Sequence, residues 1–216
     1  MKRPCKISLP KVIFIDWNKT LSHSLFWSHM IKKNHPYKRY HNKIVQFLFV
    51  ENKELINSWM RGQYTSEDIS GKISKAIKLD KEVILQELAL SCKNMSFISP
   101  KIPALIKSIQ QKGIKVTIAT DNMDTFRRYT IPGMNLVNIF DDFLVSCDLK
   151  CLKGDFKKEK LLFFDNYLQE NNLFYSEVVL LDDCLDTTGT YDKLGFKIVE
   201  TDSPKRLLEI LSSYAN

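Results

Sequence analysis

The stretch that most constrains the fold is Val12–Thr20, in which the apolar run Val-Ile-Phe-Ile leads directly into a carboxylate at Asp16. A short apolar run rich in β-branched residues is typical of a strand buried on both faces of a parallel sheet. Such a strand delivers the residue that follows it to the carboxyl edge of the sheet, where open α/β folds bind ligands. An ionised aspartate is costly there unless it binds a cation or takes part in chemistry. Asp16 is therefore the first candidate site residue.

Further strand patterns recur along the chain and alternate with helical patterns. The predicted strands are Val12–Ile15, Lys115–Ala119, Phe143–Val145, Val178–Leu181 and Phe196–Val199. Apolar residues at helical spacing predict helices over Ile102–Lys112, Asp155–Glu170 and Pro204–Tyr214. Strands that alternate with helices indicate an α/β fold, a Rossmann-like parallel sheet flanked by helices with right-handed crossovers.

The interval 21–97 breaks this alternation, because it shows helical patterns and no convincing strand. The predicted helices are Ser24–Lys33, Asn42–Arg61, Ser66–Lys78 and Lys81–Cys92. An insertion of about 75 residues after the first strand is too long for an ordinary crossover. We therefore expect a separate all-helical cap at 21–97 over the end of the sheet, and an α/β core formed by 1–20 and 98–216. A helical flank packed directly on the sheet is the alternative.

Composition and charge narrow the function classes. The 216 residues are 44% hydrophobic, which predicts a globular core, and no apolar run approaches the roughly 20 residues of a membrane span. Five cysteines without a secretion signal predict free thiols and a cytoplasmic protein. The net charge of +7 favours an anionic partner, a small phosphorylated substrate. Nucleic acid is the less favoured partner, since no nucleic-acid-binding motif accompanies the basic residues.

Polar residues at four predicted strand ends form the candidate site. They are Asp16, Thr120, Lys153 and the pair Asp182–Asp183. A phosphate monoester carries two negative charges, so a carboxylate nucleophile needs a cation to approach it. Mg²⁺ prefers hard oxygen ligands, which matches the carboxylates of Asp16 and Asp183. Thr120 and Lys153 would hold the phosphoryl oxygens, and Asp16 would attack phosphorus to form an aspartyl-phosphate.

The same residues resemble the motifs of the haloacid dehalogenase (HAD) superfamily, in its phosphatase-like branch with a helical cap after the first motif. Ile15-Asp16-Trp17-Asn18-Lys19-Thr20-Leu21 matches the family's apolar strand followed by Asp-x-Asp-x-Thr at all but one position. Thr120 matches the second motif, Lys153 the third, and Asp182-Asp183 the acidic pair of the fourth. The resemblance covers nearly the whole chain and implies an Mg²⁺-dependent phosphatase-type hydrolase.

The resemblance also implies a role for each matched residue and its neighbours. Asp16 would be the nucleophile and a Mg²⁺ ligand, Asn18 would offer its backbone carbonyl to the metal, and Asp183 would bind it with help from Asp182. Lys153 would stabilise the developing charge. Substrate would be bound by Thr120 and Lys153, by the backbone N–H of Trp17, and by Asp121 and Asn122.

The one departure from the motif is Asn18, which stands where phosphatases carry the aspartate that acts as general acid and base. An amide can do neither near neutral pH, and the loss is worth roughly 10²–10⁴ in rate. We therefore expect a phosphohydrolase that is slow or biased to good leaving groups, such as acyl phosphates. The alternatives are a catalytically impaired phosphate-binding or scaffold protein of the same fold and a different substitution at Asp16, such as carbon–halogen cleavage.

Overall fold

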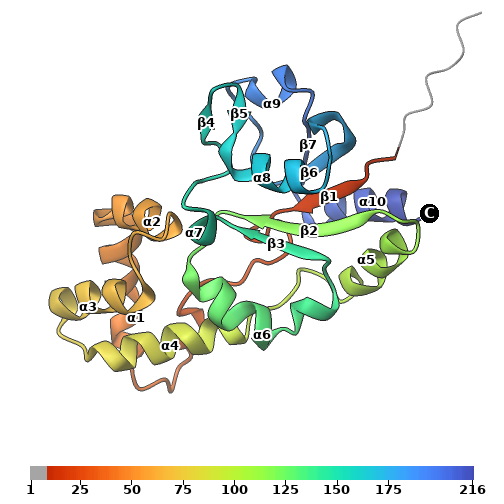
Figure 1. Cartoon of the computed structure of the whole chain (residues 1–216). Coiled ribbons are helices and arrows are strands. Elements are labelled where there is room, and N and C mark those ends of the chain that lie inside the picture. Colours follow the sequence, from red (N-terminus) through yellow and green to blue (C-terminus); the bar gives the residue numbers. More distant parts are fainter. Residues whose placement is uncertain (1–8) are drawn as a thin grey trace, which may run out of the picture.

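The computed structural model describes residues 9–216 and is built around a five-stranded parallel sheet (Figure 1). The strands lie in the order β3-β2-β1-β6-β7. Their bounds are β1 (Val12–Ile15), β2 (Lys115–Thr120), β3 (Asp142–Val145), β6 (Val178–Asp182) and β7 (Lys197–Glu200). The predicted α/β class and parallel sheet are confirmed. Cys5 and the first part of the expected core segment 1–20 lie outside the described residues.

The register of the sheet aligns the strand ends that carry polar residues. Ile15 of β1 pairs with Ile118 of β2 on one side and with Leu181 of β6 on the other. Asp16 therefore lies level with Asp182, and its backbone N–H donates to the Leu181 carbonyl at 2.9 Å.

Side chains alternate between the two faces of the sheet, and a different set of helices covers each face. Val12 and Phe14 of β1 pack with α8 (Leu162–Glu170) and α9 (Thr190–Lys193), which lie above β1, β2 and β3 in Figure 1. Ile13 and Ile15 pack with α5 (Ile102–Gln110) and α10 (Pro204–Ala215). Burial on both faces explains why this strand reads as an uninterrupted apolar run.

The interval 21–97 is helical, and no strand is found between these residues. Its helices are a 3₁₀ turn (Ser28–Ile31), α1 (Lys38–Val45), a π-helical stretch η2 (Gln46–Glu51), α2 (Lys53–Met60), α3 (Ser66–Ile77) and α4 (Lys81–Lys93). In Figure 1, α1–α3 lie beyond the end of the sheet at which β3 leads into α7 (Ser146–Leu149). The expected division into cap and core remains a prediction, since one continuous apolar cluster joins both parts.

Two helices of this interval, α3 and α4, begin with the expected capping chemistry. Thr65 and Asp68 form a reciprocal capping box at the start of α3, and Asp80 caps α4. The helix predicted over Ser24–Lys33 is reduced to the single 3₁₀ turn, which follows Trp27 in a left-handed conformation.

The first part of the helix predicted over Asp155–Glu170 is a β-hairpin. β4 (Phe156–Lys157) and β5 (Lys160–Leu161) pair antiparallel, and α8 begins only at Leu162. Lys158 and Glu159 at the turn both have positive φ, as tight hairpin turns require. The Asp155 carboxylate accepts hydrogen bonds from the distant Arg61 and from the Leu152 N–H, so tertiary contacts override the local helical pattern.

Short elements complete the described chain: π-helical η3 (Phe126–Thr130), α6 (Ile131–Gly133), and 3₁₀ turns η4 (Leu136–Asn138) and η5 (Tyr175–Glu177). Within residues 9–216, no helix combines the length and the apolar character needed to cross a bilayer.

Candidate active site

Lys153 lies at the centre of the polar cluster at the carboxyl edge of the sheet. Its Nζ is 2.9 Å from Asp16 Oδ1 and 2.5 Å from Asp182 Oδ2. Both carboxylates are buried, and the lysine side chain is 12% exposed. Two backbone contacts fix the lysine: its N–H donates to Asp121 Oδ1 at 3.0 Å, and its carbonyl accepts from the Tyr191 hydroxyl at 2.9 Å. Three of the predicted strand ends thus meet around one ammonium group.

Burial and crowding perturb the ionisation of this cluster. Burial raises the pKa of Asp16 from 3.8 to about 6; the nearby Asp182 adds to the increase, and Lys153 opposes it. Burial also raises the pKa of Asp121. Burial alone would lower the pKa of Lys153, but the surrounding carboxylates outweigh it and hold that pKa above its ordinary value. The site therefore holds more buried negative charge than one lysine can balance.

A cavity of about 570 Å³ opens onto this cluster and suits a divalent cation. Five aspartates and two lysines line it, so the donor set is rich in hard oxygens with excess negative charge. Asp183 is partly exposed, and its nearest cation, Lys19 Nζ, is 3.7 Å away. Asp16 and Asp183 are therefore the side chains best suited to hold Mg²⁺, with Asn18 beside them in the cavity wall.

Asp182 has partners that distinguish it from Asp183. One carboxylate oxygen binds Lys153, and the other accepts from the Cys184 N–H at 2.9 Å. Each oxygen keeps a second lone pair, so the metal contact of Asp182 stays a prediction. In this arrangement Asp182 holds Lys153 in position.

Thr120 ends β2 as predicted and is fully buried, and its hydroxyl has no hydrogen-bond partner within the described residues. An unpaired buried hydroxyl is costly. A phosphoryl oxygen at this strand end would satisfy the hydroxyl, which is the expected role of Thr120.

Trp17 and Asn122, both expected to bind substrate, do not line the acidic cavity. The Trp17 indole is fully buried, donates to Met95 Sδ at 3.4 Å and packs against Phe126, so only its backbone stays near the site. The backbone N–H of Asn122 donates to the Ser146 hydroxyl at 2.9 Å, and Asn122 does not line the cavity. Asp121 lines the cavity, whereas Thr120 and Asn122 do not; each of these two has a buried side-chain polar atom without a partner within the described residues.

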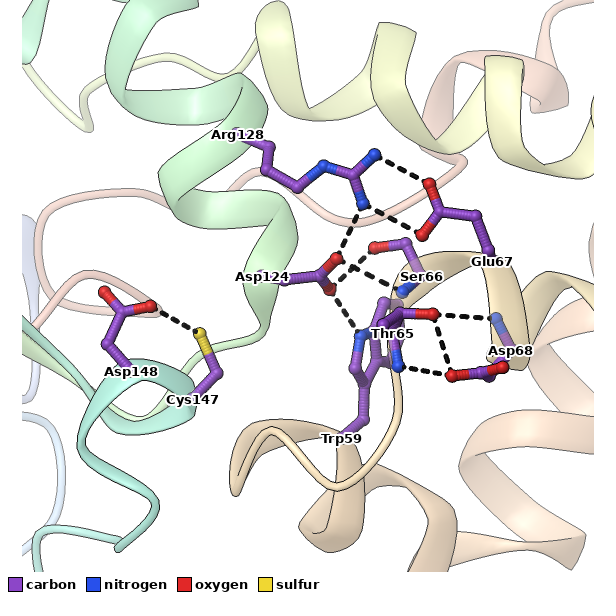
Figure 2. A network of polar contacts seen from close by, with 9 residues as sticks. All are labelled: Trp59, Thr65, Ser66, Glu67, Asp68, Asp124, Arg128, Cys147 and Asp148. Carbon is purple, nitrogen blue, oxygen red and sulfur yellow. Dashed lines mark hydrogen bonds and ion pairs between the residues drawn. The ribbon is translucent and has the colours of Figure 1, made fainter.

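The sequence alone gives little sign of how the interval 21–97 is fixed over the site. The Asp124 carboxylate accepts from Trp59 Nε1 and Ser66 Oγ, each at 2.7 Å, and from Arg128 Nη1 at 2.8 Å (Figure 2). Arg128 also makes a two-point contact with Glu67, which lowers the pKa of that carboxyl. This network, made by Trp59, Ser66, Glu67, Asp124 and Arg128, ties α2 and α3 to η3.

The three residues that follow Trp59 make further contacts with the segment between Ser146 and Asp155. The Met60 carbonyl accepts from Ser146 Oγ at 2.7 Å, Arg61 forms an ion pair with Asp155, and Met60 itself lines the cavity. Gly62 has a positive φ, and a Cβ there would lie 2.4 Å from the Cys147 carbonyl oxygen. The only local signal is the Thr65 capping box just downstream, since the partners are 58 to 94 residues away.

A second group of possible metal ligands, His29, His35 and Glu87, lies in the helical interval. His29 Nε2 is 2.5 Å from Glu87 Oε2, and His35 Nε2 is 3.4 Å from the same oxygen. The Nδ1 atom of His35 accepts from the Tyr37 N–H, so the neutral ring carries its proton on Nε2, facing Glu87. Both rings thus share one Glu87 oxygen, while His29 Nδ1 is buried without a hydrogen-bond partner within the described residues.

No family model matches the chain, and no curated protein matches it in sequence. Solved structures do match its fold. A predicted HAD-like family hydrolase from Porphyromonas gingivalis has a TM-score of 0.68 at 16% identity, covering 95% of this chain and 98% of that one. An L-2-haloacid dehalogenase from Xanthobacter autotrophicus has a TM-score of 0.61 at 14% identity, covering 95% and 83%.

An HAD-family enzyme from Bacteroides thetaiotaomicron is also similar, with a TM-score of 0.61 at 12% identity, covering 88% of this chain and 93% of that one. That structure is a complex with magnesium and inorganic phosphate.

Proposed function

We propose that this chain, which has the fold of the HAD enzymes, is an Mg²⁺-dependent phosphohydrolase that uses Asp16 as its nucleophile. One observation carries the proposal: Lys153 bridges Asp16 and Asp182 within a carboxylate-rich cavity at the end of a parallel sheet. Mg²⁺ held by Asp16, Asp183 and the Asn18 carbonyl would neutralise phosphate charge.

The protein's own residues would carry the two steps. Asp16 Oδ2, the oxygen not bound to Lys153, attacks phosphorus, and the bond from phosphorus to the leaving oxygen breaks. The hydroxyl of Thr120 donates to a phosphoryl oxygen, and Lys153 balances the charge that develops on Asp16 and the phosphoryl group. Water then attacks phosphorus in the aspartyl-phosphate, which releases phosphate and restores the Asp16 carboxylate.

Asn18 determines which substrates can react by this route. It lines the cavity and offers no proton to a leaving alkoxide. Acyl phosphates leave as carboxylates and need no proton, so the site is suited to them. The same residue supports the second candidate, a phosphate-binding protein of the same fold with impaired catalysis.

The test is hydrolysis of acetyl phosphate, measured as the rate of phosphate release with and without Mg²⁺. We expect the wild type to bind inorganic phosphate and to hydrolyse acetyl phosphate only with Mg²⁺. Asp16→Asn should abolish the hydrolysis. Phosphate binding without turnover would favour the binding protein. Turnover of a 2-haloacid by Asp16 without Mg²⁺ would overturn the proposal in favour of a dehalogenase.

A further inference from the structure

A second cavity, of about 420 Å³, lies next to the acidic one and shares part of its wall. Asn18, Met60 and Asp121 line both. The remaining wall comes mainly from the helical interval and is predominantly apolar, with Ser24, Ser28 and His41 as its polar members. Its main apolar side chains are Leu25, Phe26, Ile31, Val45, Phe49 and Ile56. A molecule with its phosphate beside Asp16 would therefore extend past Asn18 into an apolar space.

The charge of the two cavities differs sharply. Among the residues that line the second cavity there is no lysine, arginine or glutamate, and its one carboxylate is Asp121 at the shared wall. Leu25 and Ile31 expose 70% and 54% of their surface. Large apolar side chains gathered around a concavity mark a binding site for an apolar group.

We propose that this second cavity binds the hydrocarbon chain of an acyl phosphate substrate, so that the enzyme prefers acyl phosphates with such a chain to sugar phosphates and nucleotides. The inference rests on the proposed function, because it places the phosphate beside Asp16. A sugar or ribose would place most of its surface against apolar side chains, with Ser24, Ser28 and His41 as the polar groups of the helical interval in this wall, and any hydroxyl left unpaired would cost binding energy. An alkyl chain gains from the same surface by leaving water.

Alkylphosphonates provide a test that does not need turnover. Methyl-, butyl- and hexylphosphonate are titrated into the Mg²⁺-loaded protein by calorimetry, with inorganic phosphate and glucose 6-phosphate as references. We expect the dissociation constant to fall by about two- to fourfold for each added methylene, as burial of a CH₂ predicts. Glucose 6-phosphate should bind no more tightly than phosphate.

Two equally exposed side chains give a matched pair of variants. Ile31 lines the cavity and Val50 does not, and they expose 54% and 55% of their surface. Ile31→Asn should weaken hexylphosphonate at least threefold and leave methylphosphonate unchanged, whereas Val50→Asn should change neither. Leu25→Asn, at the most exposed wall position, serves as the second variant if Ile31→Asn is unstable.

The outcomes separate this inference from the proposed function. Binding of phosphate and methylphosphonate with no dependence on chain length would overturn the apolar-chain inference and leave the phosphohydrolase intact. No binding of phosphate or of any phosphonate would count against both. Tighter binding of glucose 6-phosphate than of hexylphosphonate would reverse the assigned substrate class.

Discussion

Asn18 is the residue whose chemistry separates this site from a phosphatase with a full acid–base pair. Its side chain lines both cavities. We expect Asn18→Asp to raise kcat/KM for an alkyl phosphate tenfold or more, because the new carboxyl can protonate the leaving oxygen. Acetyl phosphate, which needs no proton, should change less than threefold. Steady-state rates on both substrates measure the difference, and an equal effect on the two would mean that position 18 does not face the leaving group.

For single residues, the sequence predicts position at the sheet edge better than it predicts the contacts that each side chain makes. Asp16, Thr120 and Asp182 each end an apolar strand, and strand register alone brings them to one edge. The indole of Trp17 and the N–H of Asn122 are taken by Met95 and Ser146. Those contacts depend on packing between segments distant in sequence, which a local pattern does not encode.

The end of α2 is the element that fixes the helical interval over the site, and Asp124 is its main anchor. Asp124→Ala would leave the buried Trp59 N–H and the Ser66 hydroxyl without their acceptor. We expect unfolding free energy to fall by about 2–4 kcal/mol, and kcat/KM to fall because Met60 borders the cavity. Urea denaturation and acetyl phosphate turnover measure the two effects.

The matched control for Asp124 is Asp148, which also accepts hydrogen bonds from an arginine. The Asp148 side chain is 41% exposed and pairs with Arg127 at 2.8 Å. Asp148→Ala should cost less than about 1 kcal/mol, as for other exposed ion pairs. Equal losses in the two variants would show that the Asp124 network does not hold α2.

Helices and strands are predictable where their signals are local in sequence, and not where contacts between distant segments decide the structure. Strands and the helices α3 and α4 match their predicted bounds closely, because periodicity and caps are local. The hairpin at Phe156–Leu161 was not predicted, because the residue before it, Asp155, is held by Arg61, which directly follows α2. An amphipathic stretch gives no sign of a partner 94 residues away.

For the molecule as a whole, one apolar cluster joins the sheet to the helical interval. It contains Ile13 and Ile15 of β1 together with Trp27, Trp59 and Ile69 from 21–97. Shared burial of this kind favours cooperative unfolding. Denaturation of the whole chain can therefore measure how a substitution at one site changes the unfolding free energy.

Burial of ionised carboxylates at the candidate site lowers the free energy of unfolding when no cation is bound. The pKa of Asp16 is about 6 when folded and 3.8 otherwise. Between these values the folded state binds more protons than the unfolded state, so unfolding free energy should rise as pH falls from 7.5 to 5. Asp16→Asn should remove much of that rise and stabilise the protein at pH 7.5 by roughly 1–3 kcal/mol.

Urea denaturation in EDTA at the two pH values measures this difference, and Asp202→Asn supplies the control, because it removes one charge from the exposed surface. The control should follow the wild type at both pH values, because the Asp202 side chain lies on the exposed surface. A wild type that loses stability at pH 5 in parallel with Asp16→Asn would show that burial of Asp16 carries no cost. The charge around Lys153 would then already be balanced without a cation.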